Sequence, residues 1–260
     1  MSALASVKKV GLVVALPIVL LTVWWVATEG STDPYVPPLR EIFATFPETW
    51  TSARLMDDVV PSLVRLLIGY ALAVLLGVGL GVVIGSFRVV RGIAEPVLEF
   101  FRAIPPPVLI PIVMLFAGIG DTMKVIVIVF GCIWPVLLNT VEGVRAVDEV
   151  LGDTSRCYGV TGVARLRHLT LRSASPQIFA GMRQALSLAI ILMVISEMFA
   201  ASNGLGFTVV QFQRSFAIPE MWTGIMVLGL VGVTLSLLFG FAERRALAWY
   251  LGLRRAQRGE

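Results

Sequence analysis

The residue types that perform covalent chemistry are scarce in this chain of 260 residues. His168 is the only histidine, Cys132 lies in an apolar run, and Cys157 lies in a basic segment. We find no paired carboxylates, no nucleophile beside a base and no metal-ligand spacing, so neither an active site nor a metal site is expected. The motif G-x-x-x-x-G-K-[ST] is also missing from the sequence, so no loop for the phosphates of ATP is expected. The scarcity of these residue types and motifs argues against an enzyme.

Charged residues in or beside apolar stretches are better candidates, because they could meet a solute inside a membrane. Glu197 lies near the outer end of one stretch, where an unpaired carboxylate is costly. It is either a gate, the partner of a basic group, or a carboxylate that reaches water at the interface. Arg102 lies near the inner end of another stretch and either meets an anionic solute or anchors to lipid phosphates. Together with Pro105 and Met193, these residues are our candidates for a translocation path or gate, although methionines more often serve packing.

Membrane helices must position these residues. Hydrophobic residues make up 57% of the chain, charged residues make up 15%, and the mean hydropathy is +0.87. A soluble domain has about 45–50% apolar and about 25% charged residues, so an ordinary water-soluble enzyme is excluded. A spanning helix needs about 20 mostly apolar residues. Six windows predict an all-α integral membrane protein with about six transmembrane helices: 9–27, 61–85, 94–118, 122–141, 176–200 and 221–243.

The third window, 94–118, is the least regular, because prolines interrupt it and three of them are consecutive at 105–107. Proline removes a backbone donor and clashes with the preceding helical turn. A broken helix at membrane depth persists only where it is buried in protein or lines a water-filled cavity. The segment from Arg102 to Pro107 is therefore expected either to face a cavity or to mark the point where a helix enters the membrane.

Lysine and arginine predict the orientation, because they are concentrated in cytoplasmic loops. With the N-terminus in the cytoplasm, 16 of the 21 lie on the cytoplasmic side or its membrane edge, so we expect both termini inside. The first apolar run follows Lys8 and Lys9 but lacks a small-x-small cleavage site, so we interpret it as a retained helix. The predicted parts are an N-terminal helix (1–27), an external segment (28–60), a core of five helices (61–243) and a basic tail (244–260). The external segment is expected to contain an amphipathic helix over 39–56 that lies on the membrane, and the core includes a cytoplasmic loop (142–175).

The cytoplasmic loop 142–175 is too long for a simple turn. Asp148 and Glu149 start a short helical run that ends at Gly159, and a second short amphipathic stretch leads into Pro176. A merely solvated loop has little reason for two short helices separated by a glycine hinge. The pattern favours a rigid knob that is presented to a cytoplasmic partner.

This loop resembles the signature loop of the permease subunits of bacterial ATP-binding cassette (ABC) importers. The family's pattern is acidic-small-small-x-x-x-Gly, then nine residues, then apolar-x-Leu-Pro. The resemblance implies that Asp153 caps or salt-bridges at the interface with an ATPase and that Gly159 is a hinge. Arg172 stands where the family has its final proline. The matching residues, which we expect to couple the chain to the ATPase, are Asp153, Thr154, Ser155, Gly159, Leu169 and Leu171.

Further matches extend over most of the chain and narrow the resemblance to permeases for nitrate, aliphatic sulfonates, taurine and bicarbonate. They lie at 35–39, 102–105, 111, 116–120, 124, 139–143, 197–198 and 204–206. The resemblance implies a type I importer fold with a cytoplasmic coupling helix in the bacterial inner membrane. It also implies a second copy of the permease, two ATPase subunits that bind ATP and Mg²⁺, and an extracytoplasmic solute-binding protein. No cofactor is expected on this chain itself, and the solute is expected to be small and anionic.

A secondary transporter or a channel subunit that ATP does not drive is the alternative, since six helices could form either one as an oligomer. Neither of them needs a hinged cytoplasmic loop. An ion-coupled carrier should also contain more buried acids than Glu197 alone.

Overall fold

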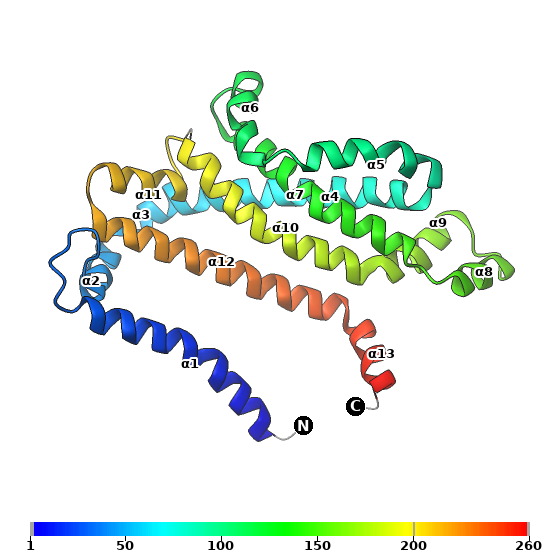
Figure 1. Cartoon of the computed structure of the whole chain (residues 1–260), viewed down its shortest axis with the longest axis horizontal. Coiled ribbons are helices and arrows are strands. Elements are labelled where there is room, and N and C mark those ends of the chain that lie inside the picture. Colours follow the sequence, from blue (N-terminus) through cyan, green and yellow to red (C-terminus); the bar gives the residue numbers. More distant parts are fainter. Residues whose placement is uncertain (1–2, 200, 259–260) are drawn as a thin grey trace.

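The computed structural model describes residues 3–199 and 201–258, and these residues form helices and loops without strands. Residues 1–2 of the predicted first helix, residue 200 of the fifth window and residues 259–260 of the predicted tail lie outside the described residues. The α-helices are α1 (Ala3–Thr28), α2 (Leu39–Thr49), α3 (Ser52–Arg54), α4 (Val60–Ser86), α5 (Arg88–Arg102), α6 (Ile110–Ala117), α7 (Asp121–Arg145), α8 (Glu149–Cys157), α9 (Gly162–Arg165), α10 (Leu171–Phe199), α11 (Leu205–Arg214), α12 (Ile218–Ala246) and α13 (Ala248–Arg258) (Figure 1).

Four helical segments are long and apolar enough to cross a membrane, namely 52–86, 121–145, 162–199 and 218–246. A fifth span results if the pair formed by α5 and the segment 106–117 is counted as one, although the two halves are bent by 82°. Helix α1 contributes a shorter apolar stretch, Ala15–Thr28, within the part of the helix whose side chains the structure describes. The predicted all-helical membrane fold is confirmed, and the predicted number of six spans is approximate.

The core is built from α4, α7 and α10, which lie side by side along most of their length (Figure 1). A glycine ladder on α4 allows its backbone to approach α7 closely. A Cβ atom at Gly77 would lie 2.9 Å from Val136 Cβ, and one at Gly81 would lie 2.6 Å from Thr140 Cβ. The ladder therefore serves packing within one protomer.

The predicted break in the third window is present, and it lies deeper than we expected. After α5 ends at Arg102, a short 3₁₀ turn over Pro106–Leu109 leads into α6. Phe101 stacks on Trp134 with ring centroids 6.4 Å apart, and Trp134 is close to the middle of α7. Arg102 therefore lies near mid-depth of the bundle rather than near the inner end of a helix.

The predicted external segment contains the amphipathic helix that the sequence predicts, but α2 ends at Thr49 and packs on protein. Leu39 and Ile42 are buried, and the following residue, Trp50, donates a hydrogen bond from Nε1 to Thr223 Oγ1 of α12 over 2.9 Å. The apolar face of α2 is thus partly covered by α12, whereas Phe43 is exposed, and the position on the membrane surface stays a prediction.

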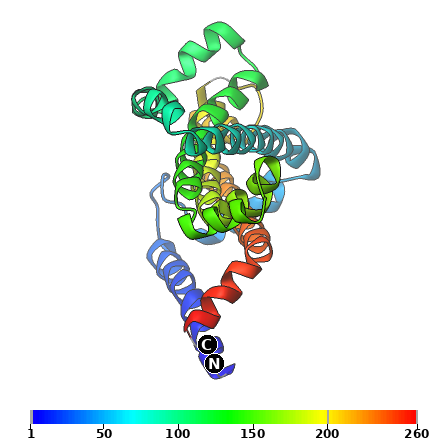
Figure 2. The same cartoon turned by 90° about the vertical axis from the view of Figure 1, so that its right-hand side faces the viewer.

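The start of α1 and the end of α13 lie close together, as two perpendicular views show (Figures 1 and 2). The loop between α7 and α10, with α8 and α9, projects beyond one end of the bundle, and α2, α3 and α11 lie at the opposite end. We refer to these as the loop end and the opposite end.

Candidate functional site

The projecting loop contains the two short helices and the glycine turn that the sequence predicts. Asp148 caps α8, its side chain accepting a hydrogen bond from the Leu151 backbone N–H at 3.1 Å. The chain reverses after Tyr158, where Gly159 has a φ of +70°. Gly162, with a φ of +55°, then starts α9, and a π-helical turn over Leu166–Thr170 joins α9 to α10. The glycines occupy left-handed backbone conformations that other residues rarely adopt.

The signature residues of the loop hold it together locally. Asp153 pairs with Arg156 at 3.2 Å on the exposed side of α8, so the capping role falls to Asp148 instead. Thr154 donates to the Val150 carbonyl at 2.7 Å, and Ser155 donates to the Gly152 carbonyl at 3.0 Å.

The base of the loop packs on the bundle. Leu171 packs against a small core formed by Val144, Ala174 and Ile178, and Leu169 is half-buried. The loop is thus a folded knob whose base is anchored to α7 and α10.

The tip of the knob is apolar, which the sequence patterns did not reveal. Tyr158 is 82% exposed and Val163 is 79% exposed, and Val150 and Leu151 of α8 are also exposed. Apolar side chains gathered on a projecting tip indicate a protein-binding surface. The available signal was the consecutive pair Val150 and Leu151 between two charged residues of α8, Glu149 and Asp153.

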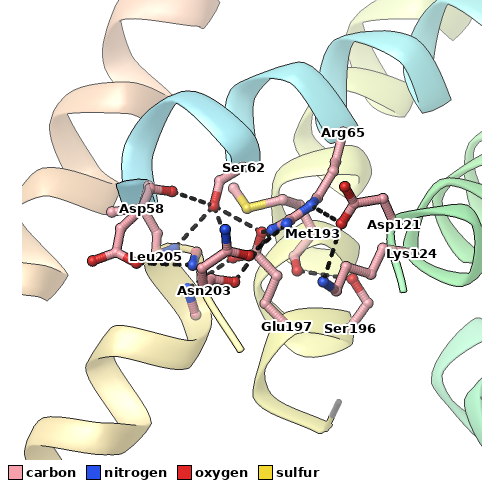
Figure 3. A network of polar contacts seen from close by, with 12 residues as sticks. Asp58, Ser62, Arg65, Asp121, Lys124, Met193, Ser196, Glu197, Asn203 and Leu205 are labelled. Atoms are coloured by element: carbon pink, nitrogen blue, oxygen red, sulfur yellow. Dashed lines mark hydrogen bonds and ion pairs between the residues drawn. The ribbon is translucent and has the colours of Figure 1, made fainter. Parts of the chain in front are cut away.

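A network of polar side chains lies at the opposite end of the bundle (Figure 3). Arg65 of α4 is at its centre and is almost completely buried. Its Nη1 lies 2.8 Å from Glu197 Oε1, and its Nε lies 2.7 Å from Asp121 Oδ1. Ser62, one turn before Arg65, donates to Glu197 Oε1 at 2.7 Å. Lys124 is also buried, and its Nζ lies 3.4 Å from Asp121 Oδ1.

The same network fixes the loop between α10 and α11. Arg65 donates from Nη2 to Asn203 Oδ1 at 2.7 Å, and the Gly204 N–H donates to Asp58 at 3.0 Å. The Gly206 N–H donates to Glu197 Oε2 at 3.0 Å. Gly204 has a φ of +117°, and a Cβ atom there would lie 2.5 Å from Glu197 Cδ. The network thus joins α4, α7, α10 and α11 at one point.

Of the three roles left open for Glu197, the structure supports the partner of a basic group. The side chain has no exposed surface, so it is not a carboxylate that reaches water at the interface. Met193, one turn earlier on α10, is equally buried and belongs to the core cluster. Sequence reasoning missed Ser62, Asp121 and Asn203, although Ser62 and Arg65 are spaced to share one helix face.

Arg102 and Pro105 lie apart from this network, at the break between α5 and α6. Arg102 is half-exposed and pairs with Glu99 at 2.7 Å, while Pro105 is exposed. Among the described residues, no group of three histidine, cysteine, aspartate or glutamate side chains could hold a metal ion.

Comparison with known proteins agrees with the fold. Residues 60–247 match the model of the family described as binding-protein-dependent transport system inner membrane component. The chain belongs to this family. The range that matches begins with α4 and ends just after α12, so it contains the knob and the polar network apart from Asp58.

Similar proteins are permeases of ABC transporters. The chain is 30% identical to the taurine transport system permease protein TauC of Escherichia coli K12, over 94% of this chain and 91% of that one. It is 27% identical to the nitrate import permease protein NrtB of Synechocystis, over 86% and 85% of the two chains. It is also 27% identical to the putative aliphatic sulfonates transport permease protein SsuC of Bacillus subtilis, over 90% and 86%.

Among solved structures, the chain is similar in fold to the inward-facing MetNI methionine ABC transporter. The TM-score is 0.64 at 17% identity, covering 75% of this chain and 97% of that chain. This family member is therefore an ABC transporter permease subunit, a multi-pass protein of the inner membrane and not itself an enzyme.

Proposed function

We propose that this permease carries a small anionic solute, of the sulfonate, taurine or nitrate class, into the cell and that ATP hydrolysis on a separate subunit drives the transport. The observation that carries the proposal is the projecting knob with its exposed apolar tip at Tyr158 and Val163. The relatives named for taurine, nitrate and sulfonates support the class of solute.

The proposed assembly contains two copies of this chain, two ATPase subunits and an external solute-binding protein. The ATPases, which would hold ATP and Mg²⁺, dock on the knob, and no cofactor is bound by the permease. The loop end then faces the cytoplasm together with both termini. The positions of α1 and α13 support this orientation, because the start of one and the end of the other lie close together.

The long helix that follows the knob supports a mechanical coupling. Helical structure continues from Gly162 to Phe199 over 38 residues, which at about 1.5 Å per residue is a rod of about 57 Å. Its first turn is α9, which belongs to the knob, and its last turn carries Glu197 in the polar network. Motion of the knob would therefore move α10 together with α4 and α7 as one body, and the alternation between inward- and outward-facing states follows from this motion.

The translocation path is proposed to run between the two copies, along the break that contains Arg102 and Pro105. A broken helix at membrane depth needs protein or a water-filled cavity beside it. In this proposal, Glu197 and Met193 lie behind the path and hold the moving body together, since neither has any exposed surface in the protomer.

Reconstitution tests the function. The permease, its ATPase and its binding protein are placed in proteoliposomes, and uptake of taurine, an alkanesulfonate, nitrate and bicarbonate is measured. We expect uptake of at least one of these anions only with ATP and with both partners present. Uptake that persists on an ion gradient without ATP would establish the secondary transporter or channel instead.

A further inference from the structure

Helix α5 carries five charged residues in a chain segment that lies beside the apolar core. If 3.6 residues make one turn, they fall within an arc of about 80° on the helix circumference. The opposite side of α5 is apolar and exposed at Val89, Ile93, Val97 and Phe100. The helix therefore has one charged stripe and one apolar face. The charged stripe comprises Arg88, Arg91, Glu95, Glu99 and Arg102.

The packing of α5 shows that it enters the membrane and does not lie flat on the surface. Leu98 packs against the cluster of Ile84, Leu137 and Val141, which belongs to the loop-end halves of α4 and α7. Phe101, one turn further on, stacks on Trp134, the fourteenth of the 25 residues of α7. The charged stripe therefore begins at the loop end and reaches roughly the middle of the helix bundle with Arg102.

The charges at depth are not covered by the protomer. Arg102 and Glu99 form an ion pair at 2.7 Å, yet their side chains are 48% and 58% exposed, and Glu95 is also exposed. Charged side chains in the hydrocarbon region are costly and face a bundle interior or a water-filled cavity. The apolar face of α5 is suited to contact with lipid tails, so the charged stripe must point toward water.

We propose that the charged stripe lines a water-filled vestibule open to the loop end, and that Arg102 at its blind end binds the transported anion in place of Glu99. This inference rests on the proposed function, because it assumes that two copies flank a path for an anion. The chemistry suits the role, since a planar guanidinium binds two oxygens of a sulfonate or nitrate at once. Glu99 neutralises Arg102 while no anion is bound.

Cysteine accessibility tests the vestibule in the assembled transporter. Cys157, the exposed native thiol, is first replaced by serine, and Cys132 is fully buried. Single variants Glu95→Cys and Glu99→Cys are compared with Ile93→Cys and Phe100→Cys, which lie at similar depth on the apolar face. A charged methanethiosulfonate reagent is added from the ATPase side. We expect the stripe positions to react at least about tenfold faster, because thiols in apolar surroundings form little thiolate. Equal rates on both faces would overturn the vestibule.

Protection by anions tests the role of Arg102 without relying on transport activity. Taurine or nitrate should slow modification of Glu99→Cys, whereas choline should not. Adding Arg102→Gln should raise the half-protecting concentration about 10- to 100-fold, as expected for loss of a hydrogen bond to a charged group, and Arg102→Lys should raise it less. An unchanged concentration in Arg102→Gln would overturn anion binding at this residue.

The two proposals can fail separately. If the wild-type transporter imports none of the tested anions with ATP, the proposed function fails, whereas the cysteine pattern still decides the vestibule. If ATP-driven uptake is observed and the stripe does not react, the vestibule alone is wrong.

Discussion

Arg65 and Glu197 form a buried ion pair across 132 residues of sequence, with Nη1 of the arginine 2.8 Å from Oε1 of the glutamate. Each is held by further partners, Arg65 by Asp121 and Asn203 and Glu197 by Ser62. A buried charge left without its partner is strongly destabilising. The pair therefore ties α4 to α10 at the end of the bundle farthest from the knob.

Replacing one member of the pair should show how strongly the stability of the protein depends on the other member keeping its partner. We expect Glu197→Gln to destabilise the protein by about 3–5 kcal/mol, because Arg65 stays buried with less counter-charge. Arg65→Met with Glu197→Leu should be less destabilising than the sum of the single changes. Thermal unfolding of the purified protein in detergent measures the loss of stability in the single variants and in the double variant. The control is Arg145→Met, which removes the exposed pair with Glu142 and should change stability by about 0–1 kcal/mol. Equal losses in Glu197→Gln and the control would contradict the role of the network.

Gly204 should not tolerate a side chain. Gly204→Ala places a Cβ atom against the Glu197 carboxylate and requires a φ of +117°, so we expect a loss of stability of about 2 kcal/mol or more. Gly229→Ala, in α12 with open space around it, should be neutral or stabilising by about 1 kcal/mol. The measurement is the unfolding temperature of each variant. Similar unfolding temperatures would refute the claim that Gly204 does not tolerate a side chain.

The glycine ladder of α4 provides a second matched comparison. Gly81→Ala would bring a Cβ atom to 2.6 Å from Thr140, whereas Gly79→Ala, half a turn away, meets nothing within 4 Å. We expect Gly81→Ala to destabilise the contact between α4 and α7 by about 1–3 kcal/mol and Gly79→Ala to have little effect. Resistance to proteolysis in membranes provides the measurement. Were Gly79→Ala the more sensitive variant, the packing of the ladder against α7 would not be what stabilises this pair of helices.

The apolar tip of the knob should be needed for the ATPase and dispensable for folding. Tyr158→Asp puts a charge on the proposed interface, so the ATPase should no longer co-purify with the permease, while the unfolding temperature stays within error of the wild type. Tyr35→Asp, at an exposed aromatic residue in the segment just before α2, should leave the ATPase bound. Co-purification from membranes that contain both subunits decides the matter. Retention of the ATPase by Tyr158→Asp would place the interface elsewhere.

The sequence by itself determined the class of protein and the position of the knob, because both depend on local patterns. Runs of about 20 apolar residues need no tertiary information to indicate membrane helices. Asp148 as a helix cap and Gly159 as a left-handed turn likewise act over a few residues, so the two short helices were predictable. The consecutive prolines at 105–107 similarly predicted the break in the third window.

The tertiary structure decided what the charges do, because contacts between distant segments do not appear in local patterns. Glu197 could have been a gate, a partner or a surface carboxylate until Arg65 and Ser62 were found against it. The depth of Arg102 depended on Phe101 stacking at the middle of α7. The apolar face of α2 is compatible with lipid or with protein, and only the tertiary structure showed that α12 packs against α2.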